Sequence, residues 1–265
     1  MTTDNIMLIP IYILAGLLGL CVGSFLNVVI YRTPNGMSLA KPDSHCTSCG
    51  YVLKWYDNIP VLSYLILGGR CRKCREHISP RYMLVEILNA VLWLLCVFLF
   101  WEQNIGYAVV SALVLSTLVC IFFIDLEHLL IFNRFVLIVF GLAIAICFFD
   151  KYANFGDHVI GLAVGGIFFL TMYYGSILIL KKEGMGFGDV KLAFAVGFLL
   201  GWQRFIFALL VASVLASVVL VIIRAARPDE SGHEYPFGPF FSVGTAAALL
   251  CGETVIEWYI GLLPF

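Results

Sequence analysis

The sequence predicts an all-α polytopic membrane protein of about eight transmembrane helices, with a small zinc-binding cytoplasmic loop domain. The first observation is composition, because 62% of the 265 residues are hydrophobic and only 12% are charged, whereas about half apolar is usual for soluble chains. The second is the recurrence of apolar runs near the roughly 20 residues that cross a bilayer. The third is an uneven placement of Lys and Arg. The net charge of −1 gives no reason to expect a nucleic-acid partner.

The apolar runs define the predicted spans and the domain organisation. The spans lie at about 6–30, 83–101, 106–124, 129–149, 158–180, 190–203, 205–223 and 238–259. The division between the sixth and seventh depends on the short break Gly201-Trp202-Gln203-Arg204. We therefore expect a first transmembrane helix within 1–31, a loop domain at 32–82, and a membrane core at 83–265.

The basic residues predict the orientation. With eight spans, all 16 Lys and Arg residues except Lys151 and Arg204 fall on the same side of the membrane. Cytoplasmic loops carry the excess of Lys and Arg, so that side is predicted to be cytoplasmic and both termini to lie outside. The basic loop 32–82 is then cytoplasmic.

Four cysteines in this loop form two Cys-x2-Cys pairs, Cys46/Cys49 and Cys71/Cys74. Paired knuckles with this spacing are typical of tetrahedral zinc bound by four thiolates. The alternative is two disulfides, which a reducing cytoplasm disfavours. Four thiolates leave no open coordination position, so the predicted zinc site is structural. Gly50, Gly68 and Gly69 supply the turns around the knuckles.

Two aspartates, Asp125 and Asp189, sit where long apolar segments meet water. An ionisable group at membrane depth is a functional-site hypothesis by default. Under the predicted topology both lie at cytoplasmic ends of spans, so they can converge. Two converging carboxylates share one proton and can activate water, as in aspartyl proteases. Gly186 and Gly188 precede the second acid and allow close approach of an extended peptide.

Other interpretations of these acids remain open at this point. Asp189 can be a helix N-cap after a flexible hinge, and capping does not exclude catalysis. Glu127 and His128 are rivals to Asp125 as functional groups. A proton-coupled transporter would also use such acids, but it predicts them near the membrane midplane within broken helices. A third class, a non-enzymatic assembly subunit, would use the zinc loop for docking and tolerate loss of either aspartate.

Across nearly its whole length the chain resembles the type IV prepilin peptidases, which belong to the GxGD group of membrane aspartyl proteases. The resemblance is carried in order by GSFLNVVIYR at 23–32, the four cysteines, NIPVLSY at 58–64, GRCRKC at 69–74, Asp125, GFGDVKL at 186–192 and PFGPF at 236–240. It departs at Phe132, where the family usually has proline after Ile131, and this puts the local turn in question.

The resemblance implies a bifunctional enzyme of the bacterial inner membrane with its active site facing the cytoplasm. Such an enzyme removes the basic leader of prepilins or pseudopilins and then methylates the new N-terminal residue, usually phenylalanine, with S-adenosylmethionine. Asp125 and Asp189 match the catalytic pair, and the four cysteines match the zinc ligands. Gly69 matches a glycine linked to methyl transfer. The implied cofactors are Zn²⁺ and S-adenosylmethionine, and the implied partners are pilin precursors and the lipid bilayer.

Overall fold

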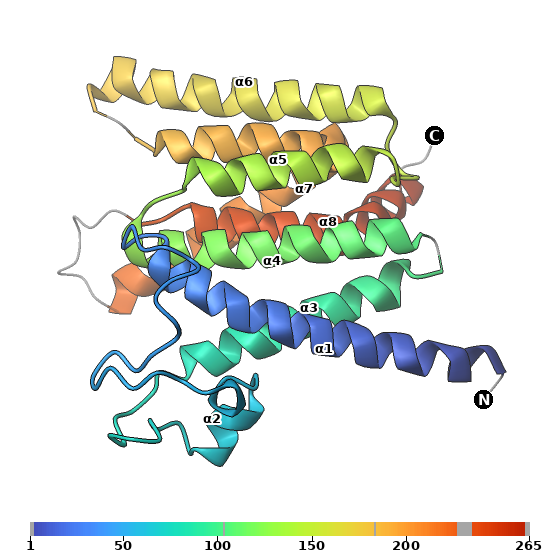
Figure 1. Ribbon diagram of the computed structural model, residues 1–265. Helices are drawn as coiled ribbons and strands as arrows, with labels where there is room; N and C mark the ends of the chain where they lie inside the picture. Colours follow the sequence, from blue (N-terminus) through green and yellow to red (C-terminus); the bar gives the residue numbers. More distant parts are fainter. Residues whose placement is uncertain (1–2, 103, 183, 227–234, 263–265) are drawn as a thin grey trace. The chain divides into compact units, whose positions relative to one another are not determined.

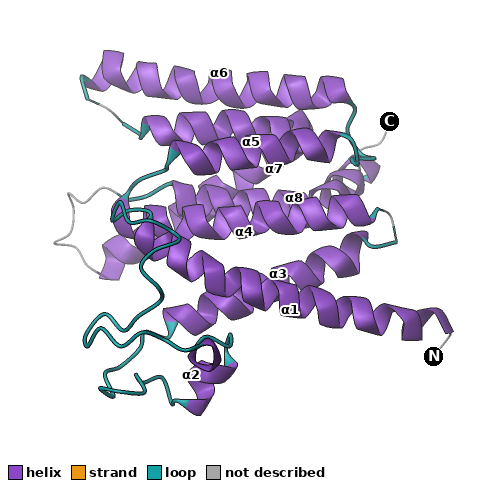
Figure 2. Ribbon diagram, viewed as in Figure 1, coloured by secondary structure: helices purple, strands orange, loops and turns teal. Residues whose placement is uncertain are grey.

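The structure, a computed structural model, describes residues 3–102, 104–182, 184–226 and 235–262. Within these residues the regular secondary structure is helical, apart from two isolated β-bridges in the loop that carries the cysteines (Figure 2). The predicted all-α class is therefore confirmed.

The helices follow the predicted apolar runs (Figure 1). They are α1 (Thr3–Arg32), η1 (Trp55–Asp57), α2 (Leu62–Ile66), α3 (Arg81–Phe100), α4 (Ile105–His128), α5 (Asn133–Cys147), α6 (Phe155–Leu180), α7 (Phe187–Ala226) and α8 (Gly238–Gly261). Among the described residues, six helices are long and apolar enough to cross a membrane, namely α1, α3, α4, α6, α7 and α8. Helix α5 is apolar but only 15 residues long.

The eight predicted spans correspond to seven of these helices, because the sixth and seventh are the two parts of α7. Helix α7 runs for 40 residues, and Gly201 inside it has φ 74° and ψ 167°, which is not helical. Such a φ is accessible to glycine without strain. The break predicted at 201–204 is therefore present, and it divides α7 into two helical parts, one before and one after Gly201.

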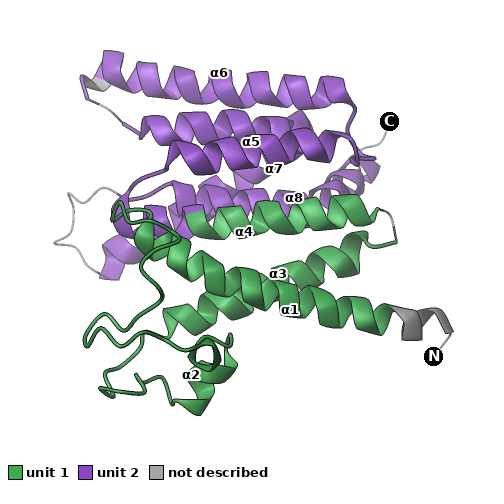
Figure 3. Ribbon diagram, viewed as in Figure 1, with its two compact units in different colours: residues 1–120 green, residues 121–265 purple. Residues whose placement is uncertain are grey.

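The described chain divides into two compact units, residues 1–120 and 121–265 (Figure 3). In the first unit α1 and α3 pack at backbone distance. A Cβ on Gly19 would lie 2.7 Å from the Ala90 Cα, and one on Gly23 would lie 2.8 Å from the Glu86 Cα. Asn89 donates to the Gly19 carbonyl at 2.7 Å. Small residues and interhelical polar bonds are the usual means of packing helices in lipid.

In the second unit α7 packs against α5, α6 and α8 (Figure 1). The contact with α6 is close because glycines face each other. A Cβ on Gly165 would lie 2.7 Å from the Ala193 carbonyl oxygen, and one on either Gly161 or Gly197 would overlap the backbone of the other. The missing side chains of these glycines let α6 and α7 approach at backbone distance.

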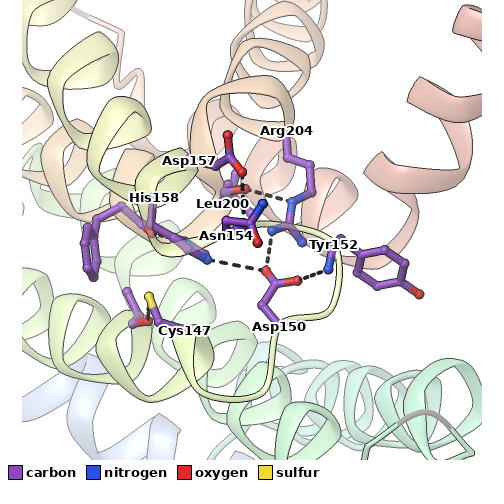
Figure 4. A network of polar contacts seen from close by, with 10 residues as sticks. Cys147, Asp150, Tyr152, Asn154, Asp157, His158, Leu200 and Arg204 are labelled. Carbon is purple, nitrogen blue, oxygen red and sulfur yellow. Dashed lines mark hydrogen bonds and ion pairs between the residues drawn. The ribbon is translucent and has the colours of Figure 1, made fainter.

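A buried polar network surrounds the Gly201 break (Figure 4). Arg204, only 4% exposed, forms an ion pair with Asp150 and donates to the Leu200 carbonyl at 2.7 Å. His158 lies 3.8 Å from the same Asp150 carboxylate and bonds the Phe198 carbonyl at 2.7 Å. These side chains satisfy carbonyls just before the break, which an apolar environment requires. Arg204, predicted to lie in an outer turn, is thus a buried structural residue.

Candidate active site and metal centre

Asp125 lies in the last turn of α4 and is 5% exposed. The helix ends directly after it, since Leu129 has φ 55° and its amide donates to the Asp125 carbonyl at 2.9 Å. Glu127 and His128 are exposed. Burial therefore separates Asp125 from its two rivals, which stand at the surface like ordinary charged residues.

Asp189 lies in the first turn of α7 and is 8% exposed. Its amide donates to the Gly186 carbonyl at 3.1 Å, which shapes the turn into the helix. Its Oδ1 atom is buried and has no hydrogen-bond partner among the described residues. A buried polar atom without a partner costs free energy. A hydrogen bond to this oxygen from a group outside the chain would remove that cost.

The two aspartates are brought to the same end of the second unit. A Cβ on Gly188 would lie 2.9 Å from the Ile131 Cβ, so the start of α7 touches the segment after α4. Lys191, three residues after Gly188 in α7, donates to the Asn133 side chain at 2.9 Å. The end of α4 that carries Asp125 and the start of α7 that carries Asp189 therefore lie at the same end of the second unit.

Glycines line the carboxyl groups on both sides. Gly186 packs beside Asp189, where a Cβ would lie 3.3 Å from Oδ2. Gly238, at the first position of α8, packs even closer to Asp125, where a Cβ would lie 2.5 Å from Oδ2. Any side chain at Gly238 would displace that carboxylate.

The sequence pattern around Gly238 does not predict a role for it, although its segment PFGPF contributes to the family resemblance. The available signal was a Gly-Pro pair opening an apolar helix, since Pro favours the first turn. What the sequence alone could not indicate is that this helix start lies against Asp125.

The turn at Phe132 keeps the form that a proline would give it. Phe132 is the N-cap of α5 with φ −76° and ψ 135°. That φ lies within the range to which a pyrrolidine ring restricts proline. The departure at this position therefore leaves the path between Asp125 and α5 unchanged.

Chemically, this end of the unit offers two buried carboxyl groups. Like charges held close together cannot both ionise easily, so the pair tends to hold one proton. An ionised carboxylate next to a protonated one can take a proton from water and donate a hydrogen bond to a carbonyl. Glycines on both flanks leave room for an extended backbone to approach.

The four predicted metal ligands also come together, within the first unit. The Sγ atoms of Cys46, Cys49, Cys71 and Cys74 all lie within 4.8 Å of one another. The Cys46–Cys74 and Cys49–Cys71 sulfur separations are 3.8 and 4.0 Å. Zn–S bonds of about 2.3 Å in a tetrahedron place the sulfurs about 3.8 Å apart. The donor set and its dimensions therefore fit zinc.

The two knuckles have the same backbone design. In each, the residue four after the first cysteine donates to that cysteine's carbonyl: Gly50 to Cys46 at 2.9 Å and Arg75 to Cys71 at 3.0 Å. Both donors have positive φ, 68° and 61°. The loop curls so that each pair of thiols faces the other pair.

The thiols have opposed proton affinities without a metal. Backbone hydrogen bonds from Cys49 and then Ser48 lower the pKa of the Cys46 thiol to about 6. A backbone hydrogen bond from Glu76 acts to lower the pKa of Cys74, but desolvation and the other three thiols outweigh it and raise that pKa to about 12. A divalent cation favours the ionised form of all four cysteines, because it binds thiolates and not thiols.

An ion pair connects the second knuckle to the segment that follows the first knuckle. The buried carboxylate of Asp57 accepts from the Arg72 guanidinium at 2.6 Å and from the Tyr51 hydroxyl at 3.2 Å. Burial acts to raise the pKa of Asp57, but the hydrogen bonds from Arg72, the Lys54 amide and Tyr51 outweigh it and lower that pKa. The pair therefore stabilises the loop above the ordinary carboxyl pKa and loses this contribution as pH falls through the lowered value.

Gly69, the residue linked by resemblance to methyl transfer, is held by Tyr64. Gly69 has φ 67°, and a Cβ on it would lie 2.8 Å from the Tyr64 hydroxyl oxygen. The Tyr64 hydroxyl donates to the Ile78 carbonyl at 3.3 Å, and the Ile78 amide donates to the Gly69 carbonyl at 2.8 Å. The absence of a side chain at Gly69 thus leaves room for the end of the Tyr64 ring.

Two family profiles match the chain. Residues 17–100 match the bacterial peptidase A24 N-terminal domain, and residues 112–221 match the type IV leader peptidase family. The four cysteines lie in the first matched segment, and Asp125 and Asp189 lie in the second. No solved structure matches the chain significantly.

Similar curated proteins are named prepilin leader peptidase/N-methyltransferase. The protein from Pseudomonas putida is 36% identical over 95% of this chain and 94% of its own length. That from Pseudomonas aeruginosa is 33% identical over 94% of this chain and 93% of its own length. That from Myxococcus xanthus is 41% identical over 83% of this chain and 67% of its own length.

Proposed function

Because this chain belongs to the type IV leader peptidase family, we propose that it cleaves the basic leader from type IV prepilins and pseudopilins and then N-methylates the new N-terminal residue, usually phenylalanine. The proposal includes two sites in the two compact units. Peptide hydrolysis takes place at Asp125 and Asp189, and methyl transfer takes place in the unit that holds the cysteines.

The observation that supports the hydrolase is the presence of two buried carboxyl groups at helix ends on the same side of the second unit. One aspartate is ionised and takes a proton from water. The other is protonated and donates a hydrogen bond to the scissile carbonyl, which raises the electrophilicity of its carbon. The unpartnered Oδ1 of Asp189 offers a position for either the water or the carbonyl. Gly186, Gly188 and Gly238 set the carboxyl positions and leave space for the peptide.

The location of the acids favours hydrolysis over proton-coupled transport. A transporter would hold its acids near the middle of the bilayer within broken helices. Here Asp125 ends α4 and Asp189 begins α7. The break in α7, at Gly201, has its own polar partners in Asp150, His158 and Arg204.

The proposed orientation places the aspartates at the cytoplasmic face of the bacterial inner membrane, with both chain termini outside. The distribution of Lys and Arg supports it. A prepilin presents a basic leader followed by an apolar helix. That helix can lie in the bilayer while its cytoplasmic end reaches the aspartates, which stand at membrane-surface depth.

Zinc and S-adenosylmethionine are the proposed cofactors. Zinc would be held by Cys46, Cys49, Cys71 and Cys74 and would fix the two knuckles in place, with no open position for catalysis. S-adenosylmethionine, when bound, supplies a methyl group on a cationic sulfur that keeps the electron pair of the broken C–S bond, while the substrate amine supplies the pair of the new N–C bond and its proton passes to solvent. The protein's part is to bind the donor and orient the amine.

The test uses the purified full-length protein in detergent with a prepilin-type substrate. The isosteric variants Asp125→Asn and Asp189→Asn should each lower the rate of leader cleavage by about 10²–10⁴-fold, the usual worth of a positioned acid or base. Glu127→Gln is the matched control, because it neutralises an exposed acid two residues from Asp125 and should cleave close to the wild-type rate. Cleavage near the wild-type rate by either aspartate variant would exclude that acid from the mechanism.

A further inference from the structure

A cavity of about 510 Å³ lies in the first unit, among α1, the cysteine-bearing loop, α2 and the first turns of α3. Its volume falls within the range of small-molecule and cofactor sites. It is separate from the aspartate pair in sequence and in unit, since all its lining residues fall within 24–86. The proposed hydrolysis at Asp125 and Asp189 does not involve this cavity.

A buried amide with an unused acceptor lines this cavity. Asn27 is 4% exposed, and its Nδ2 donates to the Tyr82 carbonyl at 2.9 Å. Its Oδ1 has no hydrogen-bond partner among the described residues. Because an unmade buried hydrogen bond is costly, the position calls for a donor group such as an exocyclic amine or an ammonium.

A buried carboxylate lines the same cavity. Glu86 is 8% exposed and accepts from the Val61 amide at 2.7 Å. No Lys, Arg or His of the described chain forms an ion pair with it. A buried carboxylate is favoured by an opposite charge nearby, so Glu86 suits a ligand that carries a positive charge.

Aromatic rings complete the lining. Tyr31, Tyr64 and Tyr82 all line the cavity, and the absence of a side chain at Gly69 leaves room for the Tyr64 ring. Tyrosine faces bind both planar bases and cations. A side chain at Gly69 would push the Tyr64 ring out of place, which gives Gly69 a physical connection to this cavity.

We propose that this cavity is the binding site of the methyl donor, an adenosyl sulfonium, with Glu86 facing its positive charge and Asn27 accepting a hydrogen bond from one of its amino groups. The inference rests on the proposed N-methyltransferase function and names the site where that function would take place. Tyr64, held by Gly69, is a positioning residue for the ligand's planar or cationic part.

Equilibrium binding to the purified full-length protein tests this assignment. The probes are S-adenosylmethionine and S-adenosylhomocysteine, which lacks the methyl group and the sulfonium charge. Glu86→Gln should weaken S-adenosylmethionine binding by about tenfold or more, as expected for loss of a charged partner, and should weaken S-adenosylhomocysteine binding much less. Asn27→Leu and Gly69→Ala should weaken both. The matched control, Glu102→Gln, changes an exposed acid just beyond the other end of α3 and should bind both ligands as wild type does.

Unchanged affinity in all three cavity variants would overturn the proposal. Equal losses for both ligands in Glu86→Gln would overturn the assigned role of its charge. Bound metal and melting temperature show whether each variant folds. Photo-cross-linking of labelled S-adenosylmethionine to the wild-type protein needs no variant, and label within 24–86 is expected whereas label within 187–261 would contradict the site.

The outcomes also separate this proposal from the one on which it rests. A wild-type protein that neither binds the donor nor methylates a processed substrate lacks the methyltransferase function. A wild-type protein that methylates, but whose cavity variants bind the donor normally, keeps the function and loses this site. A labelled basic leader peptide that cross-links within 24–86, where the donor does not, would instead assign the cavity to the substrate.

Discussion

Substitution of Gly238 by alanine provides a sharp test of how the active site is built. A Cβ at this position would lie 2.5 Å from the Asp125 Oδ2 atom, whereas non-bonded heavy atoms settle at about 3.5 Å or more. The neighbour is a carboxylate in a buried last helical turn, so it has to move by about 1 Å. A misplacement of about 1 Å can lower the rate by about 10²-fold, which corresponds to about 2.7 kcal/mol in the activation free energy.

The assay is the initial rate of leader cleavage by the purified protein, with N-methylation of an already processed substrate as a measure of folding. Gly141→Ala is the matched control, because nothing lies within 4 Å of a Cβ at Gly141 in α5. We expect Gly238→Ala to lose about 10²-fold in cleavage and Gly141→Ala to keep the wild-type rate. If Gly238→Ala cleaves as well as Gly141→Ala, then α8 does not set the position of Asp125.

Three other predictions address the metal, the buried ion pair and the turn after α4. Cys71→Ser should lower the bound zinc measured by elemental analysis, and unchanged stoichiometry would refute the four-thiolate site. Asp150→Asn removes the carboxylate from the buried ion pair with Arg204, and loss of one member of such a pair lowers the free energy of unfolding by about 3–5 kcal/mol; a melting temperature in detergent equal to wild type would contradict the structural role of the pair. Phe132→Pro should keep leader cleavage, because φ −76° suits proline, whereas lost cleavage would show that the turn needs the phenylalanine.

The sequence alone predicts much of this architecture, because the bilayer imposes strong constraints on it. Length and apolar composition are enough to locate spanning helices, and the described helices begin and end near the predicted boundaries. The break at Gly201 was visible as a short polar interruption. The burial of Arg204 at this break was not predictable, because it depends on packing against Asp150 and His158, which are distant from it in the chain.

The candidate site, like the fold, could be predicted from the sequence only in part. The four cysteines could be grouped from their spacing, since two Cys-x2-Cys pairs in one loop typically bind one zinc ion together. Asp125 and Asp189 could be selected because ionisable groups in apolar surroundings are rare. Burial, which excludes Glu127 and His128, required the structure. So did Gly238 and Glu86, whose significance depends on contacts between segments distant in the chain.

The most direct test of the account is an experimental structure of the full-length protein in lipid, bound to a peptide analogue that carries a hydroxyl in place of the scissile carbonyl. We expect this hydroxyl to lie between Asp125 and Asp189, within hydrogen-bond distance of both carboxyl groups. A hydroxyl that contacts one aspartate while the other is beyond the reach of a single water molecule would contradict it.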